Sequence, residues 1–182
     1  MEIFEIKPGL FQSSKVDDEM ELLNHEIDVV IDLEGGLDDL YSLSLHSYLY
    51  WHIFDMPWLP HLDELWSVAH YGFNAWKHGK KVLVHCAQGK NRSGLVNGCI
   101  LILGGMSGVD AVKLIQEKRP EALSNLFFKH YLENIQKGDK PMDIATATLI
   151  VNGITALMQA LPQIIASIQA MDAPEEDKQA LI

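Results

Sequence analysis

The segment from residue 81 to residue 103 constrains the fold of this chain more than any other. Residues 81–85 form a short apolar run with the pattern of a buried strand. A loop with Gly89 follows directly, and residues 94–103 are apolar and rich in small side chains, which predicts a buried helix that starts at the loop. Strand, tight loop and helix in this order are typical of an α/β fold with a parallel sheet.

The rest of the first 140 residues alternates in the same way. Apolar runs predict strands at residues 3–6, 10–11, 28–33 and 48–54, and helical spacing predicts helices at residues 16–25, 62–77, 107–118 and 124–136. We therefore expect residues 1–138 to form one α/β domain, with a short, mostly parallel central sheet flanked by helices.

The carboxy-terminal part has a different composition. Residues 137–141 (KGDKP) are a predicted linker, and residues 139–182 a predicted helical segment that ends in an acidic tail. From Ile144 to Met171 no residue is charged, and apolar residues recur at steps of three and four, so this face must be buried. Three alternatives stay open: a homo-oligomer formed through this segment, packing against the first domain, or insertion in a membrane.

The loop after residue 85 has the chemistry of a phosphate site. If its backbone N–H groups point inward, they form a nest for a dianion, to which the following helix adds its positive end. Arg92 can hold two phosphate oxygens, and the positive surroundings favour the thiolate form of Cys86, a nucleophile. The residues expected to bind phosphate are Ala87, Gln88, Gly89, Lys90, Asn91 and Arg92.

These residues carry a family resemblance. Residues 85–93 (HCAQGKNRS) resemble the H-C-x-x-G-x-x-R-S signature of the cysteine-dependent protein tyrosine phosphatases, particularly their compact, atypical dual-specificity branch. Residues 6–11, 55–57 and 118–120 also resemble segments of that family, so the similarity covers about residues 1–136. The resemblance implies that residues 1–138 are a catalytic domain that needs no cofactor.

Carried over position by position, the resemblance implies a role for each of five side chains. Cys86 attacks phosphorus and becomes a phosphocysteine, while Arg92 clamps the equatorial oxygens. Asp55 protonates the leaving oxygen and then acts as base for the attacking water. The hydroxyl of Ser93 assists departure of the thiolate, and His85 orients the cysteine.

The general acid has two competitors on the chain, Asp63 and Glu64. Asp55 directly follows an apolar run, as a loop residue at a sheet edge does. The other two suit the first turn of a helix, where carboxylates stabilise the helix dipole. We therefore expect Asp55 to be the acid.

The expected activity is that of a protein tyrosine or dual-specificity phosphatase acting on phosphotyrosine, with phosphoserine and phosphothreonine as further substrates. Lys90 supports a first alternative, because phosphatases of this superfamily that act on phosphoinositides have a basic residue after the loop glycine; inositol phosphates belong to the same alternative. A second alternative is a catalytically silent scaffold that binds phosphorylated partners. The net charge of −11 excludes nucleic acid as a partner and opposes docking on an anionic membrane.

Composition also bears on cofactors and on location. The eight histidines and two cysteines show no metal-ligand spacing, so no metal is expected. Two cysteines are too few for a disulfide scaffold, and no signal peptide opens the chain, which predicts a cytoplasmic setting. The acidic cluster Asp32, Glu34, Asp38 and Asp39 is expected to be solvated, with Asp32 able to cap a turn.

Overall fold

A mixed sheet lies at the centre of the computed structural model, which describes residues 1–35 and 45–135. Within these residues five strands are ordered β1-β2-β5-β3-β4. The strands β1 and β2 form an antiparallel hairpin, whereas the pairs β2–β5, β5–β3 and β3–β4 are parallel. Their bounds are β1 (Ile3–Lys7), β2 (Leu10–Ser13), β3 (Val29–Asp32), β4 (Ser47–Tyr50) and β5 (Val82–His85). The expected α/β fold with a mostly parallel central sheet is confirmed.

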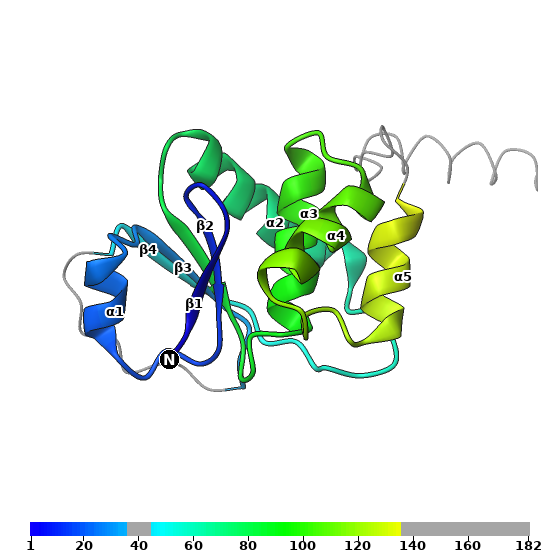
Figure 1. Ribbon diagram of the computed structural model, residues 1–182, viewed down its shortest axis with the longest axis horizontal. Coiled ribbons are helices and arrows are strands. Elements are labelled where there is room, and N and C mark those ends of the chain that lie inside the picture. The colour runs from blue at the N-terminus through cyan, green and yellow to red at the C-terminus, as the bar shows by residue number, and fades with distance from the viewer. Residues whose placement is uncertain (36–44, 136–182) are drawn as a thin grey trace, which may run out of the picture. The chain divides into compact units, whose positions relative to one another are not determined.

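Helices cover both faces of this sheet (Figure 1). One face packs against α1 (Glu19–Asn24), and the other faces the remaining four helices. These are α2 (Leu62–Lys77), α3 (Arg92–Leu103), α4 (Gly108–Lys118) and α5 (Leu126–Asn134). The helix α3 contacts β2 and β5 as well as the other three helices on this side, and the loop that leads into α3 follows the carboxyl end of β5, the central strand.

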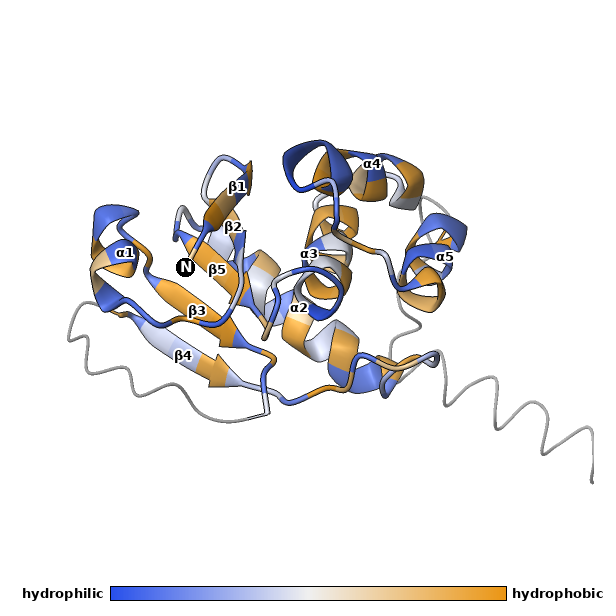
Figure 2. Cartoon of the chain, turned by 60° about the horizontal axis from the view of Figure 1, so that its bottom comes forward, coloured by the Kyte–Doolittle hydropathy of each residue, from blue (hydrophilic) through white to orange (hydrophobic). Residues whose placement is uncertain are grey.

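Alternation along the central strands explains the two apolar cores. In β3, Val29 and Ile31 belong to the core under α2 and α3, whereas Val30 packs with Leu22 of α1. All three valine and isoleucine side chains are buried, and β3 and β5 are apolar along most of their length (Figure 2). A strand covered on both faces gives a continuous apolar run in the sequence, as residues 28–33 do.

Some element ends differ from the sequence-based expectations. The strand expected at residues 48–54 ends at Tyr50, because its partner β3 ends at Asp32. The helix expected from residue 16 begins at Glu19, because the side chain of Asp18 accepts a hydrogen bond from the N–H of Met20 and caps the helix there. These differences concern the last few residues of elements that were otherwise predicted.

The domain boundary expected after residue 138, the segment from Ile144 to Met171 and the acidic tail lie outside the described residues. Across the described part of the chain, no helix has the length and apolar character needed to cross a membrane.

Candidate active site

The loop between β5 and α3 has its carbonyl groups turned outward. The carbonyl of Ala87 accepts from the N–H of Lys15, and the carbonyl of Gly89 accepts from Gln12 Nε2 at 3.0 Å. The carbonyl of Gln88 accepts from Arg119 Nη2 at 2.7 Å, and the carbonyl of Lys90 accepts from the N–H of Leu123 at 3.2 Å. Because the C=O and N–H of a trans peptide point in opposite directions, the N–H groups of Gln88, Lys90 and Asn91 face into the loop, whereas the N–H of Gly89 donates to the carbonyl of Cys86 at 3.2 Å. Inward-facing N–H groups of this kind suit an anion.

Gly89 allows the loop to lie directly on the end of β2. Its φ of +60° is in the left-handed region. A Cβ at this position would lie 2.2 Å from the carbonyl carbon of Ser13 and 2.4 Å from the backbone nitrogen of Ser14. Both neighbours are backbone atoms that cannot rotate away, so the close approach requires glycine.

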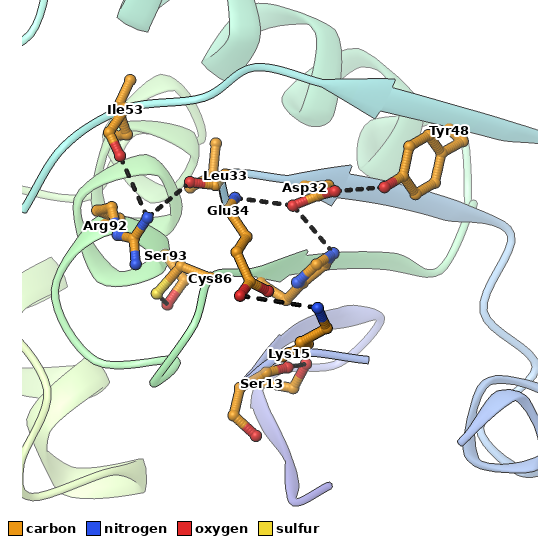
Figure 3. A network of polar contacts seen from close by, with 12 residues as sticks. Ser13, Lys15, Asp32, Leu33, Glu34, Tyr48, Ile53, Cys86, Arg92 and Ser93 are labelled. Carbon is orange, nitrogen blue, oxygen red and sulfur yellow. Dashed lines mark hydrogen bonds and ion pairs between the residues drawn. The ribbon is translucent and has the colours of Figure 1, made fainter. Parts of the chain in front are cut away.

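Arg92, the first residue of α3, is anchored by one end of its guanidinium. Its Nη1 donates to the carbonyls of Leu33 at 3.0 Å and Ile53 at 3.2 Å (Figure 3). Its Nε is buried and has no hydrogen-bond partner among the described residues. The guanidinium is therefore held in place by two backbone carbonyls, one directly after β3 and one in the segment after β4, while Nε–H remains able to donate to a bound oxyanion.

Cys86 lies at the bottom of this loop, next to the start of α3. Its side chain is buried, and its Sγ lies 3.5 Å from the hydroxyl oxygen of Ser93 (Figure 3). No side chain caps the N-terminus of α3, and its first turn contains no acidic residue. The positive end of the helix dipole is thus not compensated by the helix itself, which favours a bound anion such as phosphate at this point.

The expectation that Asp32 and Glu34 are solvated is wrong for Asp32. Asp32 is fully buried, because β3 pairs with β5 and sets Asp32 opposite His85. Its Oδ1 lies 3.6 Å from His85 Nε2, its Oδ2 accepts from the hydroxyl of Tyr48, and Oδ1 also accepts from the N–H of Glu34, the turn capping that was predicted. The buried carboxylate of Asp32 therefore lies next to His85, the residue that precedes Cys86.

Asp55 lies beside the phosphate loop, in the segment between β4 and α2. Its Oδ2 accepts from Asn91 Nδ2 at 2.9 Å, and its Oδ1 accepts from Asn125 Nδ2 at 2.8 Å. Asn91 in turn accepts from the N–H of Asn125 at 3.0 Å. The structure thus brings Asp55 together with the loop through two amide side chains.

The competing carboxylates have other surroundings. Asp63 and Glu64 lie in the first turn of α2, and Glu64 accepts from the indole N–H of Trp51 at 2.9 Å. The carboxylate of Glu64 is thus bound to Trp51, whereas that of Asp55 accepts from Asn91 of the phosphate loop. The arrangement supports Asp55 as the candidate acid.

Three supporting side chains were not identified from the sequence. Gln12 on β2 donates to the loop carbonyl of Gly89, and Asn97 on α3 donates to Gln12 Oε1 at 3.2 Å. Asn125, the N-cap of α5, binds Asp55 as described above. The available signal was the isolated amide of Asn97 within the apolar run at residues 94–103. The other two are ordinary polar residues whose partners are distant in sequence.

Among the described residues, no group of three or more His, Cys, Asp or Glu side chains is arranged to hold a metal ion. Comparison with known families gives one match: the catalytic domain of the dual specificity phosphatases matches residues 10–138. No curated protein matches the chain.

Solved structures with the same fold include several phosphatases. Human DUSP28 is 22% identical, with a TM-score of 0.66 over 75% of this chain and 93% of the other. The human tyrosine phosphatase-like serine/threonine/tyrosine-interacting protein is 26% identical, with a TM-score of 0.60 over 72% and 93%. PTPMT1 in complex with PI(5)P is 17% identical, with a TM-score of 0.60 over 73% and 96%. The likeness to DUSP28 and PTPMT1 concerns the fold.

Proposed function

The chain belongs to the dual specificity phosphatase family, and from this membership we propose that it hydrolyses phosphomonoesters through a phosphocysteine at Cys86, with phosphotyrosine in proteins as its main substrate. The observation that carries the proposal is the loop whose carbonyls face outward around Cys86 and whose arginine is anchored by Nη1 alone. This arrangement suits a dianion bound over the cysteine sulfur.

In the first step the Cys86 thiolate attacks phosphorus, an S–P bond forms and the P–O bond to the leaving group breaks. Asp55 gives its proton to the leaving oxygen, which is otherwise a poor leaving group; general acid catalysis of this kind contributes about 10²- to 10⁴-fold in rate. The loop N–H groups and Arg92 Nε hold the equatorial oxygens, where charge is shared in the transition state.

In the second step a water molecule attacks the phosphocysteine. Asp55, now a carboxylate, takes a proton from this water, an O–P bond forms, and the S–P bond breaks to return the thiolate and release inorganic phosphate. The 3.5 Å contact from Ser93 Oγ to Cys86 Sγ supports a role for the hydroxyl in stabilising the departing thiolate.

Aromatic side chains near Asp55 support an aryl phosphate as substrate. A cavity of about 460 Å³ lies along the segment that carries Asp55 and is lined by Trp51, Ile53, Phe54 and Trp58, although by no residue of the phosphate loop. Phe54 and Trp58 are 67% and 53% exposed, so their faces are available to a substrate ring or to apolar residues of a peptide. A tyrosine ring also spans more depth than a serine or threonine side chain.

Two alternatives remain as outcomes of the test. Lys90 favours a phosphoinositide or inositol phosphate, and PTPMT1, which shares the fold, was solved with PI(5)P. The likeness to a phosphatase-like interacting protein favours a silent phosphate-binding scaffold. The presence of Cys86 in the loop, with Arg92 and Ser93 in the first turn of α3, supports turnover over silent binding.

The test is hydrolysis of an aryl phosphate and of a phosphotyrosine peptide by the full chain, with phosphoserine peptide and inositol phosphates in parallel. We expect vanadate-sensitive turnover that is fastest on the phosphotyrosine peptide and abolished in Cys86→Ser. Faster turnover of inositol phosphates would transfer the proposal to that class. Tight phosphopeptide binding without turnover in folded protein would establish the scaffold instead.

A further inference from the structure

Two lysines belong to the phosphate loop or contact its backbone, and each is paired with a glutamate. Lys90, within the loop, has its Nζ 2.6 Å from Glu121 Oε2. Lys15, whose N–H donates to the loop carbonyl of Ala87, has its Nζ 3.9 Å from Glu34 Oε1 (Figure 3). The shorter pair is the tighter one, and it involves the lysine nearest in sequence to Arg92.

Glu121 also acts on a second cation. Arg119 donates from Nη2 to the loop carbonyl of Gln88 at 2.7 Å, so its guanidinium lies against the same loop. The pKa of the Glu121 carboxyl is lowered by its hydrogen bond from Lys90, by the charge of Lys90 and by the charge of Arg119. Glu121 is therefore ionised at neutral pH and sits between two cations of the loop's surroundings.

The backbone fixes Glu121 at this place. It belongs to the turn that follows α4, in which the N–H of Ala122 donates to the carbonyl of Arg119 at 2.9 Å. The N–H of Leu123 then donates to the carbonyl of Lys90 at 3.2 Å, which ties the turn to the phosphate loop. Lys90 and Glu121 thus belong to two segments that are joined by a backbone hydrogen bond.

An exposed ion pair such as Lys90–Glu121 adds little to folding stability. Its main effect is therefore on the electrostatic potential at the phosphate loop. A second phosphate on a substrate would need an unpaired cation near the loop, and Lys90 is the cation that the loop itself supplies. We propose that Glu121 is a specificity-determining residue that occupies Lys90 and so restricts the site to substrates with a single phosphate. This inference rests on the proposed function and concerns its substrate class.

The test compares Glu121→Gln with Glu117→Gln, which removes the same charge from the exposed end of α4, where Glu117 pairs with Lys113 at 4.0 Å. The ratio of kcat/KM for inositol trisphosphate to that for p-nitrophenyl phosphate is measured at low ionic strength. We expect Glu121→Gln to raise this ratio about fivefold to tenfold, because a free cation close to a bound anion is weakly screened. Glu117→Gln should leave it unchanged.

Lys90→Ala provides the second arm of the test. In Lys90→Ala/Glu121→Gln the ratio should return to within about twofold of Lys90→Ala alone. An unchanged ratio in Glu121→Gln, or an equal rise in Glu117→Gln, would overturn the inference. A rise in the ratio from Lys90→Ala to Lys90→Ala/Glu121→Gln would overturn it as well.

A binding measurement separates this inference from the proposed function. In a Cys86→Ser background, calorimetry measures the affinity for inositol trisphosphate with and without Glu121→Gln. A fivefold or greater gain supports the charge restriction even if the parent chain hydrolyses nothing, in which case the proposed function fails alone. Hydrolysis of aryl phosphate with no gain in affinity leaves the proposed function standing and removes the role of Glu121.

Discussion

Gly89 is the residue at which the shape of the phosphate loop is most sensitive to a single methyl group. In Gly89→Ala the new Cβ would meet the backbone of Ser13 at 2.2 Å, so the loop must move away from β2. Because a displacement of about 1 Å at reacting groups costs on the order of 10²-fold in rate, kcat/KM for an aryl phosphate should fall by about that factor. Gly105→Ala, at another glycine with a positive φ but with no atom within 4 Å of the added Cβ, is the control and should stay near the parent value. Parent-like kinetics in Gly89→Ala would contradict this account of the loop.

The two cysteines are expected to differ in reactivity. Burial raises the pKa of the Cys99 thiol, so this group stays protonated, and therefore unreactive, throughout the range in which alkylation is usually done. Iodoacetamide near neutral pH should modify one thiol in the folded protein and two after unfolding, counted by mass spectrometry. Vanadate or phosphate should protect the reactive one, and Cys86→Ser should abolish labelling of the folded chain. Labelling of Cys99 in the native state would refute the assignment.

Single residues of the site were predictable where their chemistry is local. The cysteine, arginine and serine of the loop stand at fixed spacing between a strand and a helix, which a sequence displays directly. Asp32 was misjudged, because its burial depends on Tyr48 and His85, which other strands bring next to it. Glu121 was not identified for the same reason: its partner Lys90 is distant along the chain.

At the scale of elements, α5 is coupled to Asp55 through its N-cap. Asn125 Oδ1 accepts from the N–H groups of Phe127 and Phe128, while Nδ2 donates to Asp55 and to the carbonyl of Met56. One amide side chain thus starts a helix and holds the segment that carries the candidate acid.

The two roles of Asn125 can be separated by substitution. Asn125→Ser keeps a capping oxygen but loses the amide donor, whereas Asn125→Ala loses both. Turnover of phenyl phosphate, whose leaving group needs protonation, should fall about tenfold in both variants, and turnover of p-nitrophenyl phosphate should change little. Only Asn125→Ala should also lose about 1 kcal/mol in free energy of unfolding by denaturant titration. A normal phenyl phosphate rate in the serine variant would exclude the positioning role.

Element types were predictable from periodicity, and element ends were less so. The apolar run at residues 28–33 indicated a strand covered on both faces, which the two cores confirm. The apolar run at residues 48–54 is longer than β4, which ends at Tyr50. It continues because Ile53 is buried although it lies outside the strand. Strand length is set by the partner β3, and that information is not in the run itself.

For the molecule as a whole, the net charge of −11 opposes the positive interior of the loop at longer range. A phosphotyrosine peptide with acidic neighbours should therefore have a lower kcat/KM than one with neutral neighbours at about 0.02 M salt. The difference should shrink by roughly threefold at about 0.2 M salt, because screening acts mainly on the distant charges. A difference that is independent of salt would indicate that close contacts at the site decide the preference.

The outward-facing carbonyls of the phosphate loop have a consequence for refolding. Their donors come from β2, from α4 and the turn after it, and from α3, so no short fragment of the chain holds the information for a competent anion cup. During refolding, oxyanion affinity should emerge only when hairpin, sheet and helices have docked together. Vanadate quenching of a fluorescent probe would then report the final docking event, later than the recovery of helical dichroism.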